Sequence, residues 1–210
     1  ENTNNNTINI FSGSTVRTSN NDRVIYIHGA DGFTINNYGN VLSSRGVSVS
    51  LNGTSNTIIN NFSSGILESE RGNISANNGT NSNNTITNYG KIFSSATSGS
   101  STYDVIDYNA SSTSNTIVNH ASGEIYTMGE GVTIRLGNSS SLVNSGKIAN
   151  YYDPTNVVIQ TSNDNNTITL KDKSILIGKI KISAGTSGNK LQINHGIGST
   201  YFYETEGDFE

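Results

Sequence analysis

The chain has 210 residues, of which 32% are apolar and 13% are charged, and it contains no cysteine. Ordinary soluble domains contain roughly 45–50% apolar and about 25% charged residues, so a conventional globular core is not expected. The missing cysteines exclude disulfides and thiolate metal sites, and twelve Lys and Arg residues set thinly against sixteen acids disfavour a nucleic-acid partner. No apolar run reaches the roughly 18 residues of a membrane-spanning helix.

A short motif recurs along the chain and decides the fold prediction. Its form is Asn-Thr-Ile-x-Asn, followed a few residues later by Gly-x-Ile. Taken at the first apolar residue, the copies are anchored at Ile8, Ile35, Ile58, Ile86, Ile117, Leu142, Ile168 and Leu191. The copy around Ile58 carries one extra residue, so its register is ambiguous by one. Anchors separated by 23 to 31 residues under a constant motif are typical of a solenoid with insertions in its loops.

Each repeat contains three short strand candidates. Those before the motif are 24–27, 47–51, 73–76, 104–108, 131–136 and 156–160. The second is the Thr-Ile-x-Asn stretch, and those after the motif's glycine are 40–42, 91–93, 124–126 and 147–149. Apolar and polar residues alternate within them, so each strand has one buried face. The sequence therefore predicts an all-β protein, a right-handed single-stranded parallel β-helix of about seven coils at 1–200, with an acidic and aromatic tail at 201–210.

Stacking of the coils sets equivalent residues above one another in columns. The expected apolar column contains Ile35, Ile58, Ile86, Ile117, Leu142 and Ile168. Two residues later, a column of amides linked by hydrogen bonds is expected at a bend, where Asn tolerates left-handed dihedral angles. Its members are Asn37, Asn88, Asn119 and Asn144. The glycines that follow are expected to let the chain turn sharply; they are Gly39, Gly90, Gly123 and Gly146.

An aromatic column is expected next to the amides, formed by Tyr38, Phe62, Tyr89 and His120. Such a column is stabilised by its own stacking, and it also offers a candidate binding surface for sugars or proteins. We expect the structural role to outweigh the binding role, because stacking needs no ligand.

Catalytic chemistry is not indicated. The three histidines, His28, His120 and His195, lie far apart, with no carboxylate or serine at nucleophile spacing. Two acid pairs deserve a test as a polysaccharide-cleaving site. We expect Glu68 and Glu70 to lie in a solvated connection, and Asp104 and Asp107 to point to opposite faces of a strand. The prediction is therefore a non-enzyme without cofactor or metal ligands.

The pairing of Asn-Thr-Ile-x-Asn with Gly-x-Ile, over about residues 6–193, resembles the passenger repeats of bacterial type V autotransporters. That resemblance implies an adhesin-like protein displayed at the outer surface of a bacterial cell. It also implies that contact with the membrane is made only through a C-terminal barrel that this sequence does not include.

Three functions follow as hypotheses. The first is an extracellular passenger acting as a stalk or adhesin, with cell-surface glycans or proteins as partners. The second is a self-assembling subunit of a surface layer or filament, whose partners are copies of itself, because the terminal coils still carry the repeat and present unpaired strands. The third, and least favoured, is a polysaccharide-active enzyme or phage tailspike.

Overall fold

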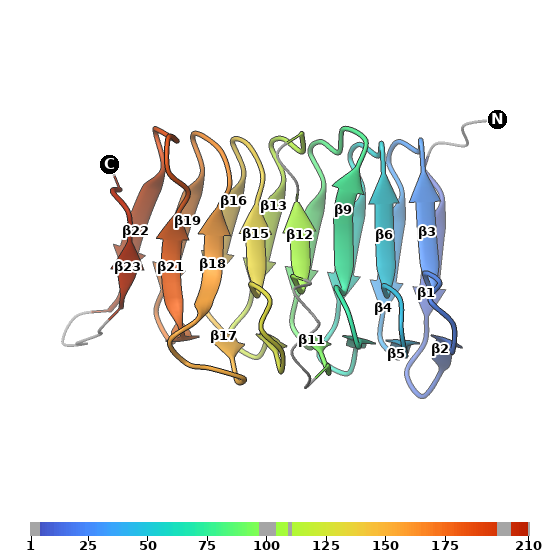
Figure 1. The fold of residues 1–210 in the computed structure, drawn as a ribbon. Helices are drawn as coiled ribbons and strands as arrows, with labels where there is room; N and C mark the ends of the chain where they lie inside the picture. The colour runs from blue at the N-terminus through green and yellow to red at the C-terminus, as the bar shows by residue number, and fades with distance from the viewer. Residues whose placement is uncertain (1–4, 97–103, 109–110, 197–202, 210) are drawn as a thin grey trace.

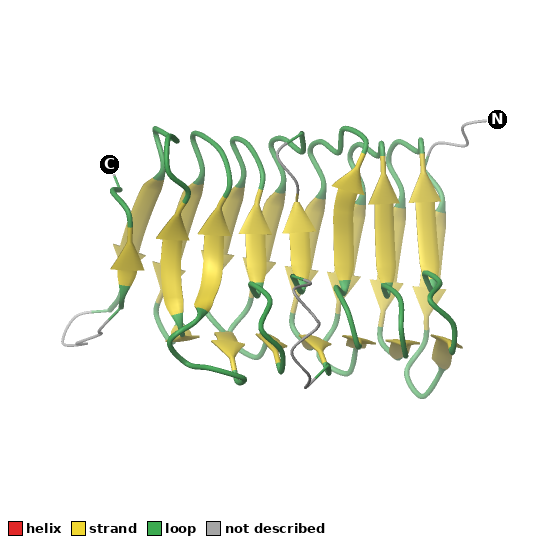
Figure 2. Cartoon of the chain, viewed as in Figure 1, coloured by secondary structure: helices red, strands yellow, loops and turns green. Residues whose placement is uncertain are grey.

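The computed structural model describes residues 5–96, 104–108, 111–196 and 203–209, which wind into a right-handed parallel β-solenoid (Figures 1 and 2). Every described strand pairs parallel with the equivalent strand of the next coil, giving three long sheets and about seven coils. No described residue belongs to a helix long and apolar enough to cross a membrane. The predicted fold class is confirmed.

Each coil contributes one strand to each sheet. Sheet A contains β1 (Thr7–Ile10), β4 (Thr34–Asn37), β7 (Ile58–Asn61), β10 (Thr85–Asn88), β13 (Thr116–Asn119), β16 (Ser141–Asn144), β19 (Thr167–Lys171) and β22 (Lys190–Asn194). Sheet B contains β2 (Thr15–Thr18), β5 (Asn40–Ser43), β8 (Ile66–Ser69), β11 (Lys91–Ser94), β14 (Glu124–Thr127), β17 (Lys147–Asn150) and β20 (Ile175–Ile177). Sheet C contains β3 (Ile25–His28), β6 (Val49–Asn52), β9 (Ile74–Asn78), β12 (Ile106–Tyr108), β15 (Ile134–Leu136), β18 (Val157–Thr161), β21 (Lys179–Ile182) and β23 (Thr205–Glu206).

The apolar column on sheet A is confirmed except in one coil. In-register pairing stacks Ile8, Ile35, Ile59, Ile86, Ile117, Leu142, Ile168 and Leu191. The prediction of Ile58 was wrong, because Ile58 points outward and is 41% exposed while Ile59 is buried. The motif fits both registers, but only the observed one brings Phe62 against Tyr38 and Tyr89 and gives Gly65 the spacing from its amide that Gly123 has.

The amide column is confirmed and contains one more member, Asn61. The side-chain Nδ2 of each Asn donates to Oδ1 of the next at 2.8 Å, along Asn37, Asn61, Asn88, Asn119 and Asn144. All five side chains are fully buried. The column ends where Ile10 and Leu170 occupy the equivalent positions in the flanking coils. A buried polar row is tolerated here because each amide is both a donor and an acceptor.

The glycines after the amides are needed because the backbone of the preceding coil approaches them closely. They are not needed for the turn conformation that we expected. None of the four predicted glycines has a positive φ. A Cβ added at Gly90 would lie 2.3 Å from the carbonyl oxygen of Gly65 and 2.4 Å from that of Phe62. Left-handed backbone occurs instead at a column of residues just before the sheet A strands, which includes Asn56 and Asn83. The buried amide residues do not have this conformation.

A second buried polar column lies at the corner between sheets C and A. Here a side-chain oxygen accepts the backbone N–H of the equivalent residue one coil earlier, as when Asn84 Oδ1 accepts from Thr57 at 2.8 Å. The members are Thr57, Asn84, Asn115, Ser140, Asn166 and Asn189. Sequence reasoning missed the role of this first residue of the motif, although its recurrence before Thr-Ile was visible.

We expect Asn88→Ala to destabilise the solenoid strongly. It removes the acceptor of Asn61 and the donor to Asn119, and each buried polar atom left without a partner costs about 1–3 kcal/mol. Urea unfolding followed by circular dichroism measures the loss. The matched control is Asn36→Ala in the solvent-facing row Asn9–Asn36–Asn60, where a change of about 0.5 kcal/mol or less is expected. Equal losses in the two variants would contradict the structural role of the buried column.

Candidate functional site

The predicted aromatic column exists as a continuous stack at the turn between sheets A and B. Ring centroids of Tyr38 and Phe62 are 4.0 Å apart, and those of Tyr89 and His120 are 3.9 Å apart, with interplanar angles of 2° and 9°. Phe62 and Tyr89 are also parallel within 4° but are separated by 6.4 Å. The column therefore consists of two tight pairs with a wider junction between them.

Stacking determines what the aromatic column offers to a partner. Within each tight pair the ring faces cover one another, so ring edges and tyrosine hydroxyl groups remain for contact with solvent. Tyr38 is 38% exposed, and the other three rings are half-buried. Burial, with the nearby Lys171 charge, lowers the pKa of His120, so this ring is uncharged at neutral pH. The column can thus form an uncharged, hydrogen-bonding strip.

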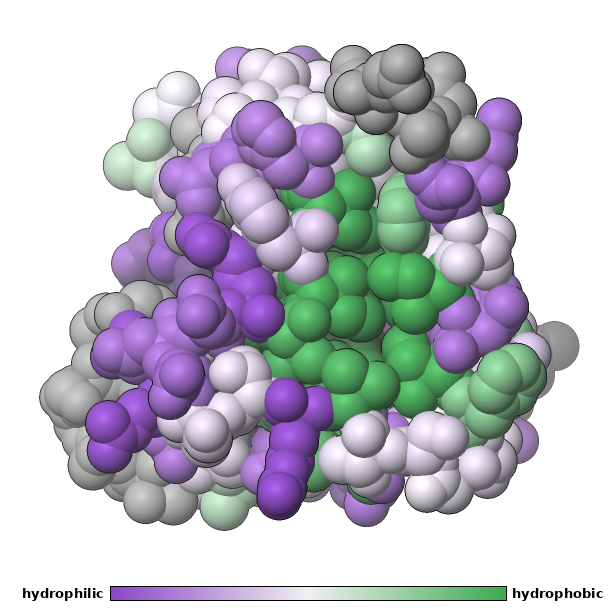
Figure 3. All heavy atoms as spheres, turned by 90° about the vertical axis from the view of Figure 1, so that its right-hand side faces the viewer, coloured by the Kyte–Doolittle hydropathy of each residue, from purple (hydrophilic) through white to green (hydrophobic). Residues whose placement is uncertain are grey.

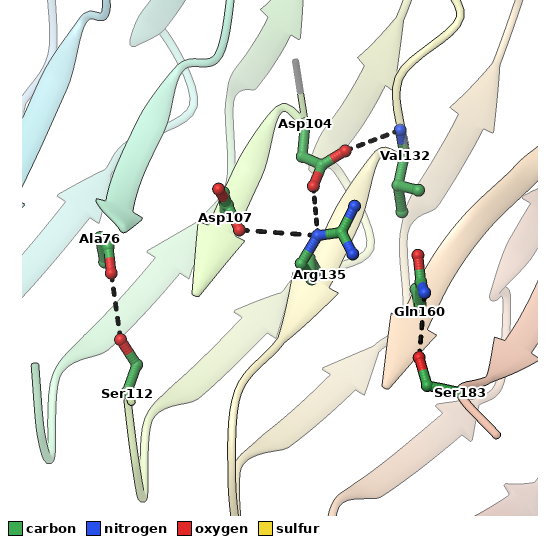
Figure 4. Close-up of polar contacts among 8 residues, drawn as sticks. All are labelled: Ala76, Asp104, Asp107, Ser112, Val132, Arg135, Gln160 and Ser183. Carbon is green, nitrogen blue, oxygen red and sulfur yellow. Dashed lines mark hydrogen bonds and ion pairs between the residues drawn. The ribbon is translucent and has the colours of Figure 1, made fainter. Parts of the chain in front are cut away.

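A charged cluster joins two coils on the outer face of sheet C (Figure 4). Arg135 Nε lies 2.5 Å from Asp104 Oδ2 and 3.6 Å from Asp107 Oδ1, and the backbone N–H of Val132 donates to Asp104 Oδ1 at 2.9 Å. The expectation that the two acids point to opposite faces was wrong. Asp104 precedes the first residue of β12, so the alternation of a strand does not extend to it.

Burial dominates the electrostatics of this cluster. It raises the pKa of Asp104, against the opposing hydrogen bond from Arg135. Burial and then the neighbouring Asp104 raise the pKa of Asp107 to about 6, while the Arg135 charge lowers it. The guanidinium of Arg135 thus pairs with both carboxyl groups. This arrangement is typical of an ion cluster that links adjacent strands.

The outer face of sheet C continues from this cluster as a polar stripe. Ser75, Asp107, Arg135, Gln160 and Lys181 occupy equivalent positions in successive strands. Figure 4 shows Gln160 reaching toward Ser183, and its Nε2 donates to Ser183 Oγ at 3.0 Å. Within the described residues, no group of three or more His, Asp or Glu is placed to hold a metal ion.

A cleft of about 470 Å³ lies on the outer face of sheet B. Its lining residues are Arg17, Thr18, Ser19, Leu42, Ser43, Ser44, Glu68, Glu70 and Ser95. Glu68 lies within β8 and not in a connection as we expected, whereas Glu70 follows the end of that strand. The cleft thus combines hydroxyl groups with two carboxylates and one guanidinium.

Aromatic residues occupy the outward-facing row of sheet B that contains the cleft residue Glu68. Phe93 and Tyr126 follow Glu68 in register, and their rings stack with centroids 4.7 Å apart. Tyr151 meets Tyr126 edge-on at 5.2 Å. Burial first, then the charges of Glu124 and Glu68, raise the pKa of Tyr126 to about 12. Sequence reasoning missed this second surface, although the recurrence of large side chains after the third-strand isoleucines could have indicated it.

The three histidines lie in separate coils and each stacks on a tyrosine. His28 lies beside Tyr26, and His195 beside Tyr203, whose hydroxyl is 3.0 Å from His195 Nε2.

A comparison with protein-family models, curated proteins and solved structures finds no match for this chain.

We expect the stability of the protein to fall as the pH rises from about 4 to 6, in part because of Asp107. Its pKa is raised from the ordinary 3.8, so between these values the folded chain holds more protons than the unfolded chain. A shift of this size corresponds to about 3 kcal/mol at most. Unfolding by urea across this pH range measures the effect, and Asp107→Asn is expected to remove the contribution of Asp107 and so to reduce the fall in stability.

Asp31→Asn is the control for this pH dependence. Hydrogen bonds from Asn56 and Ser55 lower the pKa of the exposed Asp31, so its contribution to stability increases with pH. An Asp107→Asn protein whose pH profile matches the unmodified chain would show that Asp107 does not titrate as its surroundings indicate.

Proposed function

We propose that the chain is a non-catalytic, extracellular binding and display module, acting as the stalk or adhesive passenger of a cell-surface protein. The observation that carries the proposal is the placement of side chains on the outside of the rod. Aromatic and hydroxyl-bearing residues recur at equivalent positions coil after coil, on a core of stacked apolar and amide columns. A repeated surface of this kind suits an extended or repetitive partner.

Cell-surface glycans or proteins fit these surfaces chemically. Sugars are bound by hydroxyl and carboxylate groups together with aromatic rings, and sheet B presents all three, in its cleft and in the neighbouring Phe93–Tyr126 pair. The aromatic column Tyr38–His120 runs beside sheet B, at the turn that leads into it. Weak contacts repeated along a rigid rod add up to useful avidity.

The sequence motif supports a location outside the cell. Its resemblance to autotransporter passenger repeats, and the absence of cysteine, suit a chain exported to a bacterial surface.

The arrangement of Asp104 and Asp107 supports a binding role over a polysaccharide-cleaving role for this acid pair. Asp104 is bound by both Arg135 and a backbone N–H, and its side chain is only 5% exposed. Asp107 shares the same guanidinium. A polysaccharide-cleaving pair needs two accessible carboxyl groups flanking the substrate, and this cluster offers neither group freely.

Binding of labelled protein in solution to a glycan array and to intact cells tests the proposal. We expect Tyr38→Ala and Tyr89→Ala to weaken binding roughly tenfold, since each removes an aromatic contact of about 1 kcal/mol or more. Tyr26→Ala is the matched control, because Tyr26 is 50% exposed on sheet C, outside the proposed surface. Circular dichroism verifies that each variant is folded.

Two outcomes would contradict this function. Failure of the unmodified protein to bind any glycan or cell would remove the adhesive role. Release of shorter saccharides from the array would show that the protein cleaves glycans, and would contradict a non-catalytic function.

A further inference from the structure

The N-terminal end of the rod exposes the apolar core. Figure 3 looks along the rod onto this end and shows a continuous hydrophobic surface at its centre, ringed by polar residues. Ile8 in β1 and Val16 in β2 belong to the inward-facing columns, above Ile35 and Val41. Val16 is 42% exposed and Ile8 is half-buried, whereas Ile35 and Val41 are fully buried. Ile10, Ile25 and Ile27 of the same coil are buried, so the opening in the described first coil is centred on Ile8 and Val16.

The same end also presents open strand edges. Each of β1, β2 and β3 is the outermost strand of its sheet and pairs with one neighbour only. The buried amide column does not reach this coil, because Ile10 occupies its position. The end therefore offers an apolar centre with a backbone edge in all three sheets, which is the surface that another coil would pack against.

The C-terminal end is different because the chain covers part of it with its own residues, although Ile193 in β22, in register with the buried Leu170, is 53% exposed. Strand β23 adds an outermost strand to sheet C beyond β21. The side chains of Tyr203 and Phe209 pack on the core, and the Tyr203 hydroxyl donates to the carbonyl oxygen of Ser174 at 3.3 Å. The edge strand β22 begins with Lys190, and lysine on an edge strand opposes pairing with another chain. A head-to-tail stack would have to displace these residues.

We propose that a second copy of this chain covers the N-terminal end, with the two rods joined N-terminus to N-terminus about a two-fold axis. The occupant must supply both an apolar centre and strand edges, and the N-terminal end of another copy supplies them without rearrangement. A two-fold interface must be self-complementary. The charged residues at 5–31 are Arg17, Asp22, Arg23 and Asp31, two of each sign, so the surfaces do not repel through net charge.

The directions of the strands are compatible with this two-fold axis. Figure 1 shows β1 and β3 running in opposite directions on opposite sides of the rod, with β2 between them. All three strands have four residues. With the two-fold axis through β2, this strand lies antiparallel to β2 of the second copy. Strand β1 of one copy then faces β3 of the other, and the two run antiparallel. The inference does not depend on the proposed binding function, because it is argued from the exposed apolar residues and strand edges of the first coil. Strand β2 nevertheless contributes Arg17 and Thr18 to the sheet B cleft, so the cleft borders the proposed interface.

Light scattering coupled to size-exclusion chromatography tests the assembly. The unmodified chain is expected to elute with twice its mass of 22.3 kDa. Val16→Glu places a charge on the apolar end and is expected to halve the measured mass. The matched control is Ile175→Glu, at the opposite edge of the same sheet, where Ile175 is 49% exposed, and it is expected to remain dimeric. Circular dichroism confirms that both variants are folded.

A monomeric unmodified chain at every soluble concentration would overturn the proposal and would mean that something other than a second copy covers this end. Orientation is tested separately, because the chain has no cysteine and a single introduced thiol is unique. With a short bismaleimide, Thr15→Cys in β2 is expected to form a covalent dimer and Thr205→Cys in β23 is not. A covalent product from Thr205→Cys alone, or only from a mixture of the two variants, would refute the N-terminus to N-terminus arrangement.

Discussion

The structure depends on one constraint, that groups turned toward the inside of a coil are satisfied mainly by the equivalent groups of the coils above and below; the buried hydroxyl groups of Tyr108 and Thr161 are exceptions. An apolar side chain meets this condition by packing on another apolar side chain. A polar side chain meets it only when it is a donor and an acceptor at once. The amide of Asn has both properties and no charge, so Asn37, Asn61, Asn88, Asn119 and Asn144 repeat without conflict. A column of carboxylates or ammonium groups in this place would repel itself. The same condition explains why a chain with so few apolar and charged residues folds at all.

Stacking also explains how the repeat length varies without damage to the core. Two extra residues lie in the turn between Asn61 and Gly65, and two in the turn between Asn119 and Gly123, compared with the coil that passes from Asn88 to Gly90. In each of these coils a Cβ added at the glycine would meet a backbone carbonyl oxygen of the coil before it. The extra residues therefore extend into solvent, while the positions that must stack remain in register. Loops that can change in length around a fixed core are the usual places for binding residues.

The sequence predicted the fold and most columns because one motif repeats with the residue types that stacking requires. It misplaced Ile58 because Thr57, Ile58, Ile59, Asn60 and Asn61 satisfy the motif in two registers, and the choice depends on the aromatic neighbours of Phe62. It separated Asp104 from Asp107 because strand alternation was applied to a residue outside the strand, and their common partner Arg135 lies in the next coil, 28 residues from Asp107. The sheet B cleft was not anticipated, since its depth depends on how side chains of four coils pack. Such contacts between coils are set in three dimensions and leave no short pattern in the sequence.

The two ends of the rod follow from the same constraint, because a terminal coil has a neighbour on one side only. At the C-terminal end the chain returns over its last coil and supplies Tyr203 and Phe209 as partners. At the N-terminal end Ile10 takes the place of an amide, so no buried donor is stranded, but the apolar columns that end in Ile8 and Val16 stay exposed. This end combines unpaired strand edges with an exposed apolar centre, and the proposed association rests on both. In the proposed pair, joining two rods at this end would double the number of aromatic columns presented to a repetitive partner, and so would strengthen binding without any change in the binding residues.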